Sequence, residues 1–224
     1  MKIDIITLFP EMFDGVFSSS IIKRAIDSNK VTINLINFRD FSCDPHGHVD
    51  DTPYGGGSGM VLKCEPIFLA VESVKTEESK VILLTPSGNP YNQRKAYDLS
   101  SEKHLIIICG HYEGFDERIR SLADYEISIG DYVLTGGEIP AMVIVDSVVR
   151  LIPGVIKEQS HLEDSFNDDN LLDYPTYTKP SEFRGMKVPD VLLSGDHKKI
   201  ADWRLEEAKK KTNEIRPDMG DNGK

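Results

Sequence analysis

Three loops of similar make-up carry residues that could bind a ligand: LLTPSGNP (83–90), CGHYEGFDER (109–118) and SIGDYVLTGGE (128–138). Each places glycine where an apolar run ends, so backbone N–H groups there can approach a ligand closely. Parallel α/β sheets bind ligands at the carboxyl ends of their strands. One such loop alone is typical of an ordinary tight turn, but the three together predict a pocket lined by main chain.

The common cofactor and nucleophile motifs are absent. The sequence has no G-x-x-x-x-G-K-[ST], no G-x-G-x-x-G after its first apolar run and no G-x-S-x-G. P-loop hydrolysis and a Rossmann dinucleotide site are therefore disfavoured. His46, His48 and His111 do not combine with the three cysteines at metal-ligand spacing, so no metal site is predicted.

The stretch VDDTPYGGGSGM (49–60) places four glycines within five positions. It could be a linker, a phosphate cradle or part of a site. Strand and helix patterns of one domain continue on both sides of it, which disfavours the linker.

The elements that must position these loops alternate between strand and helix patterns. Short runs rich in β-branched residues occur at 2–8, 31–37, 80–86, 104–110 and 124–130, and helix-compatible segments at 65–75, 91–101 and 114–123. This order predicts βαβ units and a mostly parallel sheet, hence an α/β fold. The stretch 136–154 is apolar almost all round and predicts a buried helix.

The C-terminal third changes in character. Residues 157–173 contain seven charged residues, six of them acidic, without a clear period. We expect an α/β domain at 1–155, a flexible acidic linker or lid at 156–174 and a helical domain at 175–224. The last domain would be built on one helix over 194–216, capped by Ser194 or Asp196.

Charge and composition limit the possible partners. The net charge of −11 is uneven, since residues 176–224 carry 11 Lys/Arg against 9 Asp/Glu and residues 1–175 carry 15 against 28. A polyanion would have to meet local, chiefly C-terminal, basic faces, although Lys209–Lys211 also suit a solvated helix face. The three cysteines lack a pairing pattern, no leader is evident and no apolar run is long enough to span a bilayer, which predicts a cytoplasmic protein.

Several long motifs together resemble one family. GHYEGFDERI, SIGDYVLTGGEIPAMV, RLIPGV, EDSF and VDDTPYGGGSGM are similar to those of bacterial tRNA (guanine-N1)-methyltransferases, which are SPOUT-class enzymes. The resemblance covers nearly the whole chain in the expected order. Two departures are His111, where many relatives carry Arg, and Ser58, which interrupts the glycine run where Pro is frequent. The first leaves the local charge pH-dependent.

The resemblance implies an α/β fold with a SPOUT-type parallel sheet, a deep C-terminal trefoil knot and a small all-helical C-terminal domain. It implies that S-adenosylmethionine binds in the knotted loops in a bent form, held largely by main chain. The implied cofactor-binding residues are Thr85, Pro86, Gly110, Tyr112, Glu113, Gly114, Ile129, Gly130, Asp131, Tyr132, Val133, Leu134, Gly136, Gly137 and Pro140. For Tyr112 and Tyr132, packing with a satisfied hydroxyl is the alternative.

The resemblance also assigns chemistry on the guanosine at tRNA position 37, immediately 3′ of the anticodon. Asp164 would be the general base for the N1 proton and Arg150 the donor toward O6 or a phosphate, with Ser165 assisting. Glu113 would position the cofactor or a Mg²⁺ ion, which the resemblance suggests for activity. The implied tRNA contacts are Asp50, Asp51, Tyr54, Gly55, Gly57, Gly59, Lys179, Arg184, Lys187, Lys198, Lys199 and Arg204.

The resemblance further implies a homodimer, with the pocket of one subunit facing the C-terminal domain of the other. Two alternatives stay open. One is a SPOUT enzyme that modifies another RNA base or a ribose; the other is a non-catalytic RNA-binding protein with this fold. The presence of both Asp164 and Arg150 speaks against the second.

Overall fold

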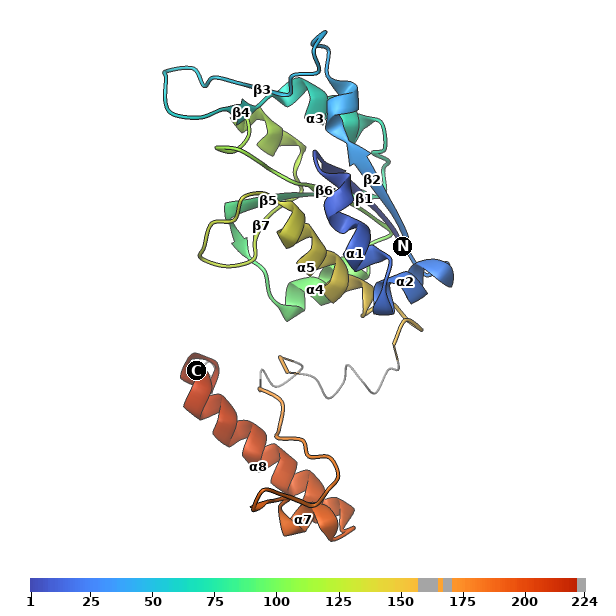
Figure 1. Cartoon of the computed structure of the whole chain (residues 1–224), viewed down its shortest axis with the longest axis vertical. Coiled ribbons are helices and arrows are strands. Elements are labelled where there is room, and N and C mark those ends of the chain that lie inside the picture. Colours follow the sequence, from blue (N-terminus) through green and yellow to red (C-terminus); the bar gives the residue numbers. More distant parts are fainter. Residues whose placement is uncertain (157–164, 167–170, 221–224) are drawn as a thin grey trace. The chain divides into compact units, whose positions relative to one another are not determined.

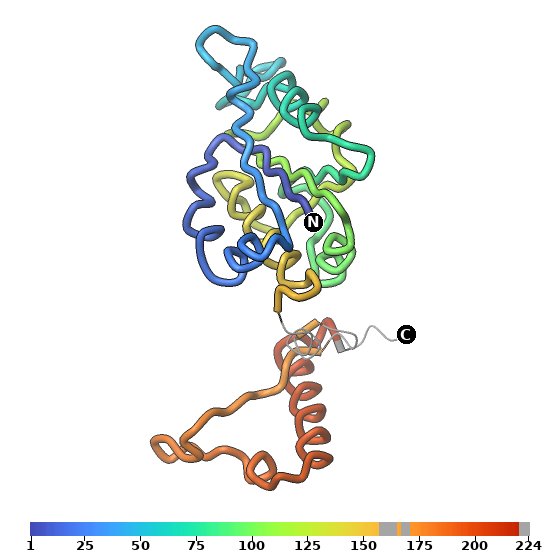
Figure 2. Tube along the Cα trace, turned by 90° about the vertical axis from the view of Figure 1, so that its right-hand side faces the viewer, coloured from blue at the N-terminus to red at the C-terminus, as the bar shows by residue number. Residues whose placement is uncertain are grey.

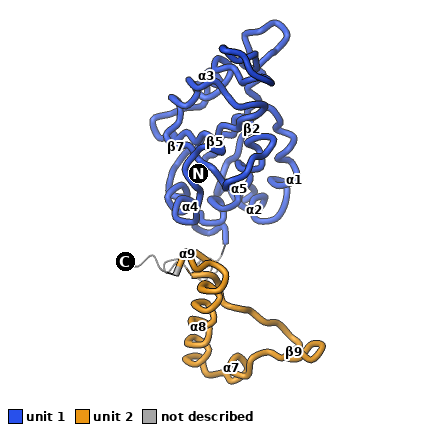
Figure 3. Tube along the Cα trace, turned by 90° about the vertical axis from the view of Figure 1, so that its left-hand side faces the viewer, with its two compact units in different colours: residues 1–156 blue, residues 157–224 orange. Residues whose placement is uncertain are grey.

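A sheet of parallel strands organises residues 1–156, the first of two compact units; the second comprises residues 157–224 (Figure 3). The computed structural model describes residues 1–156, 165–166 and 171–220. The strands follow the order β2-β1-β6-β5-β7 and each neighbouring pair is parallel. They are β1 (Lys2–Thr7), β2 (Thr32–Asn37), β5 (Ser79–Pro90), β6 (His104–Ile108) and β7 (Tyr125–Ser128).

Helices cover both faces of this sheet (Figure 1). One face packs against η1 (Pro10–Phe13), α1 (Asp14–Phe17), α2 (Ser20–Asp27), α4 (Gln93–Ser100) and α5 (Glu138–Val149). The other packs against η2 (Phe38–Phe41), α3 (Cys64–Glu72) and η3 (Glu117–Leu122). Every residue of the central strand β6 is buried, which explains the unbroken apolar run Leu105–Ile108.

Two irregular features lie at the carboxyl ends of the strands. Between β5 and β7 the register jumps, since Leu84 and Asn89 both pair with Ile127, so residues 85–88 leave the ladder. The glycine-rich stretch connects β3 (Asp50–Asp51) and β4 (Val61–Leu62), which pair antiparallel. The segment from η2 to β4 extends from the body of the unit (light blue in Figures 1 and 2).

The expected helix over 114–123 is instead the shorter 3-10 helix η3. Gly114 has a φ of +118°, outside the helical region, and the Asp116 side chain accepts a hydrogen bond from the Arg118 N–H at 2.9 Å. A capping carboxylate at this position starts the turn late. Ala123 is extended and leads directly into β7, which leaves no room for a longer helix.

The C-terminal unit is mostly helical. Its helices are α7 (Asp190–Leu193), α8 (His197–Ile215) and α9 (Pro217–Gly220). Asp196 caps α8, as expected, by accepting from the Lys199 N–H at 3.2 Å. The unit also contains a short hairpin, β8 (Glu182–Phe183) with β9 (Met186–Lys187), which the sequence did not predict. Arg184 and Gly185 both have positive φ, as two-residue hairpin turns require.

None of the helices that the structure describes is both long and apolar enough to cross a membrane.

Candidate functional site

A cavity of about 370 Å³ opens at the carboxyl ends of β5, β6 and β7, where the three glycine-containing loops meet. This volume lies in the range of small-molecule sites. Every residue predicted to bind the cofactor lines the cavity, with the exception of Asp131, which is exposed. The three loops that the sequence analysis grouped together therefore do converge.

Gly137 shows why the cavity wall needs glycine. The Gly137 N–H donates to the Gly110 carbonyl at 2.8 Å, so the start of α5 lies directly against the end of β6. A Cβ at Gly137 would lie 2.6 Å from Cys109 Cα and 2.8 Å from the Gly110 nitrogen. These are backbone atoms, so no side-chain rotation could relieve the clash.

A small polar cluster lies behind this wall. Glu138, the first residue of α5, is 2% exposed, and its Oε1 accepts a hydrogen bond from the Thr7 hydroxyl at 2.8 Å. Burial, and secondarily the nearby Glu138 carboxylate, raises the pKa of the Cys109 thiol. Cys109 is thus a protonated, inert core residue at neutral pH.

His111 has an unsatisfied nitrogen at the cavity. Its ring packs against Phe9 and Tyr112, with centroids 4.8 Å and 5.0 Å away. Its Nδ1 is buried and has no hydrogen-bond partner within the part of the chain that the structure describes. Because His111 lines the cavity and buried polar atoms are normally paired, this nitrogen marks a place for a polar group of a ligand or for water.

The glycine-rich stretch meets the cavity wall at Glu113. The Glu113 N–H donates to the Met60 carbonyl at 3.1 Å, and the Leu62 N–H donates to the Gly114 carbonyl at 3.0 Å. A Cβ at Gly59 would fall 2.3 Å from Glu113 Cγ, and the φ of +82° at Gly59 lies in the left-handed region that favours glycine. Tyr54, within the stretch, is fully exposed. The stretch is therefore joined to the cavity wall and is not a free spacer.

Comparison with known proteins decides the family. The model of the family described as tRNA (Guanine-1)-methyltransferase TrmD matches residues 1–222. The chain belongs to this family. A tRNA (guanine-N(1)-)-methyltransferase of Dictyoglomus turgidum is 59% identical over 219 residues, covering 98% of this chain and 89% of the relative. One of Staphylococcus aureus is 58% identical over 222 residues, covering 98% and 90%.

Membership in this family makes the protein a methyltransferase and assigns its parallel sheet to the SPOUT class. The trefoil knot expected from the sequence follows from that class. The roles of individual residues are a separate matter, which depends on where the fold places each one.

Arg150 is not at the cavity of its own chain. It is the C-cap of α5, whereas the cavity residues Gly136 and Gly137 precede the N-terminus of that helix. A helix of 12 residues spans about 18 Å. Within one N-terminal unit the structure therefore separates Arg150 from the predicted cofactor-binding residues.

Asp164 lies outside the described residues. The next residue, Ser165, is half-buried, and its hydroxyl oxygen accepts from the Asp173 N–H at 2.8 Å. This bond ties Ser165 to the segment that precedes the C-terminal hairpin.

The predicted tRNA-binding cations of the C-terminal unit lie at or near its surface in weak local contacts. Lys199 pairs with Asp196 at 3.1 Å and Lys187 with Glu182 at 3.9 Å. Arg184 lies over the Phe183 ring, and Arg204, which is partly buried, lies over the Tyr174 ring. Lys179 and Lys198 are exposed. Exposed pairs contribute little to stability, so their cations can exchange their partners for phosphate at small cost.

The described residues contain no group of three or more His, Cys, Asp or Glu side chains that could hold a metal. Mg²⁺ usually takes one or two carboxylates and keeps several waters. Glu113, which lines the cavity, could supply one such carboxylate.

The sequence analysis missed several lining residues, among them Phe115, Glu117 and Arg120. Glu117 and Arg120 belong to η3, which the sequence indicated only as part of a helix-compatible segment. The high charge density of DERIR was the available signal, but an exposed helix has the same composition.

Proposed function

We propose that this protein transfers a methyl group from S-adenosylmethionine to N1 of the guanosine at tRNA position 37, immediately 3′ of the anticodon. The observation that carries the proposal is the cavity at the three loop ends of a family member, lined by nearly all the cofactor-binding residues that the family resemblance implies. The relatives from Dictyoglomus turgidum and Staphylococcus aureus are named tRNA (guanine-N(1)-)-methyltransferases, which supports the same activity.

The residues present fit the methyl donor. The cavity has a suitable volume, main-chain groups of glycines form much of its wall, and the buried His111 Nδ1 lacks a partner among the described residues. Tyr112 and Tyr132, both partly exposed, add aromatic surface for an adenosyl group. When bound, S-adenosylmethionine supplies an electrophilic methyl group on a sulfonium centre.

The chain's own side chains handle the proton and the developing charge. Guanine N1 carries a proton, and the Asp164 carboxylate accepts it. The negative charge that spreads onto O6 is stabilised by the Arg150 guanidinium, whose planar donors suit an oxygen acceptor. Ser165 orients the base. Glu113 positions the donor or contributes a carboxylate to a Mg²⁺ ion.

We propose that the active site is shared between two copies of the chain in a homodimer. Arg150 lies at the far end of α5 from the cavity, which supports a site completed by the partner's Arg150 and Asp164. The cations of the C-terminal unit would contact tRNA phosphates, and Asp50 and Asp51 the guanine edge. The proposed substrate of this shared site is cytoplasmic tRNA.

The test of the base is Asp164→Ala. Removing the carboxylate leaves the cavity untouched, so binding of S-adenosylmethionine should stay near wild type while methyl transfer falls by about 10²-fold or more. The matched control is Glu163→Gln, which removes a neighbouring acid of the same segment and should retain activity. Undiminished transfer by Asp164→Ala, or an equal loss in the control, would remove Asp164 as the base.

The target base is tested with an unmodified tRNA transcript and a labelled methyl donor. Label should enter the transcript with guanosine at position 37 and fail to enter one with that base changed. Nuclease digestion with mass spectrometry then identifies the methylated atom. Label at another base or a ribose would indicate a different RNA target, and no label with intact RNA binding would indicate a non-catalytic protein.

A further inference from the structure

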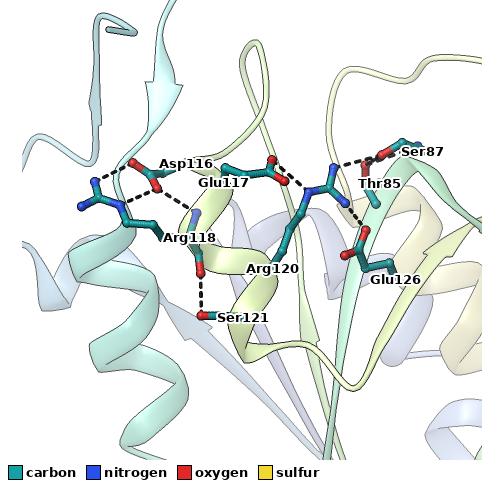
Figure 4. A network of polar contacts seen from close by, with 8 residues as sticks. All are labelled: Thr85, Ser87, Asp116, Glu117, Arg118, Arg120, Ser121 and Glu126. Atoms are coloured by element: carbon teal, nitrogen blue, oxygen red, sulfur yellow. Dashed lines mark hydrogen bonds and ion pairs between the residues drawn. The ribbon is translucent and has the colours of Figure 1, made fainter.

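Arg120 is a cavity-lining residue to which the proposed function gives no role. Its guanidinium donates from Nε to Glu117 Oε2 at 3.0 Å and from Nη2 to the Ser87 hydroxyl at 3.1 Å, and its Nη1 pairs closely with Glu126 (Figure 4). The Arg120 side chain is 29% exposed, so water screens these bonds only in part. Two carboxylates and a hydroxyl thus fix the plane of a single guanidinium.

These contacts reach the first two cavity loops and the strand that leads into the third. Ser87 belongs to the residues that leave the β5–β7 ladder, and Glu126 lies in β7, just before the third loop. The Arg120 guanidinium also lies over the ring of Phe115, 5.6 Å from its centroid, in the second loop. Figure 4 shows Arg120 between Glu117 on one side and Ser87 and Glu126 on the other.

Residues 85–88 of β5 have no ladder partners in β7, so side-chain contacts such as that of Arg120 help to hold them. Leu84 and Asn89 pair with β7 on either side of them. The Ser87 hydroxyl, which Arg120 holds, is 3.0 Å from the hydroxyl of Thr85. Thr85 and Pro86 line the cavity, whereas Ser87 does not. Arg120 therefore acts on the cavity wall through Ser87.

We propose that Arg120 is a positioning residue for the methyl donor, because its guanidinium ties the three cavity loops into the arrangement that binds the donor. This inference rests on the proposed function, which supplies the ligand. The planar guanidinium of arginine suits this positioning role, since its several N–H donors can bond to partners in different directions at once.

Arg118 provides a matched control in the same 3-10 helix. It is 70% exposed, pairs with Asp116 through Nε and Nη2, and does not line the cavity. Its removal deletes the same charge two residues away and cuts only bonds to Asp116 within the second loop, so the connections between loops stay intact. Ser87→Ala is the complementary variant, because it cuts the link to residues 85–88 at an exposed residue outside the cavity.

The experiment measures S-adenosylmethionine binding by calorimetry on the full-length protein, together with KM for donor and for tRNA. Arg120→Met should weaken donor binding about 10-fold and Ser87→Ala about threefold, since bonds to a charged group are lost. Arg120→Lys should restore part of the loss, and Arg118→Met should bind as wild type. At saturating donor, kcat and the KM for tRNA should be close to wild type in every variant.

Combining Arg120→Met with Ser87→Ala should weaken binding no more than Arg120→Met alone, since both cut one connection. Donor binding within twofold of wild type in Arg120→Met, an equal loss in Arg118→Met, or a fully additive double variant would overturn the inference. If Arg120→Met does not fold, unchanged donor binding by Ser87→Ala overturns it equally. A wild-type protein that binds no donor would instead refute the proposed function itself.

Discussion

Asp4 anchors a buried polar network across the amino-terminal halves of four strands, β1, β2, β5 and β6, away from the loops that form the cavity. It is fully buried in β1, and its carboxylate accepts from Asn34 at 2.7 Å and pairs with Lys2 and with His104 Nε2, each at 2.8 Å. His104 Nδ1 in turn lies 2.7 Å from the Ser79 hydroxyl. Ser79, His104 and Asp4 resemble a hydrolase triad in their residue types, but their burial excludes substrate. The network therefore stabilises strand register.

Acid titration should reveal the contribution of the Asp4 carboxylate to the stability of the fold. Burial alone would raise the pKa of Asp4, but bonds from Lys2, Asn34 and His104 outweigh it and hold that pKa below its usual value. A lowered folded-state pKa stabilises the fold above the unfolded value of about 3.9 and ceases to do so as pH falls through the folded value. Asp4→Asn should lower the free energy of unfolding by about 3 kcal/mol at pH 7.

Urea unfolding at a series of pH values checks this. The difference between wild type and Asp4→Asn should shrink below pH of about 4, where Asp4 of the unfolded chain begins to protonate, and should level off below the lowered pKa of the folded protein. Asp27→Asn, which removes a carboxylate from an exposed pair with Lys23, should leave stability almost unchanged at every pH. A pH-independent difference would show that packing, not charge, makes Asp4 necessary.

At the scale of elements, helix α8 holds the C-terminal end of the acidic linker predicted at 156–174. The Leu172 N–H donates to the buried Thr212 hydroxyl at 2.9 Å, and Lys211 Nζ donates to the Asp173 carbonyl at 2.9 Å. The Asp173 N–H reaches back to Ser165, the residue after the proposed base. Helix α8 thus anchors residues 172–173 and, through them, Ser165.

Thr212→Val should release this anchor while keeping the shape of the side chain. It leaves the Leu172 N–H without its acceptor, at a cost of about 1–3 kcal/mol. Hydrogen exchange at Leu172 should accelerate accordingly, and methyl transfer to tRNA should fall while donor binding is unchanged. Thr212→Ser keeps the hydroxyl and should behave as wild type. Equal exchange rates in the Val and Ser variants would contradict the anchoring role.

The elements themselves were largely predictable, for an identifiable reason. Runs such as HLIIICG contain buried β-branched residues in unbroken series, and only a central parallel strand combines these features. The 3-10 helix η3 was misjudged because its periodicity over six residues cannot be distinguished from that of an α-helix. The extension of β5 to Pro90 was not predictable either, since it depends on pairing with β7 after a register jump.

The convergence of the three loops at the cavity was predictable, but the contacts that connect them were not. Glycine after each strand indicated the three loops, and the family resemblance supplied roles for their residues. Arg120 was not singled out because its positioning role depends on Ser87 and Glu126. These two residues are far from each other in the sequence, and no local pattern brings them together. The separation of Arg150 from the cavity likewise became visible only once α5 had defined ends.

The separation of Arg150 from the cavity of its own chain leads to a prediction about the whole molecule. If the cavity of one chain uses Asp164 of the other, two inactive variants with different defects should complement each other. Asp164→Ala lacks the proposed base but keeps the cavity. Gly137→Ala keeps the base, but its added Cβ meets the backbone of Cys109 and Gly110, so it should lose donor binding.

The two variants, carrying different tags, are refolded together and the mixed dimers are isolated. Each mixed dimer contains one intact site, formed by the cavity of the Asp164→Ala chain and the base of the Gly137→Ala chain. With random pairing half of the dimers are mixed, so the unfractionated mixture should recover about a quarter of wild-type activity. A site completed within one chain predicts no recovery, because each chain then carries its own defect. Activity in the mixed dimers therefore distinguishes a shared site from two independent ones, whichever residues contact the tRNA.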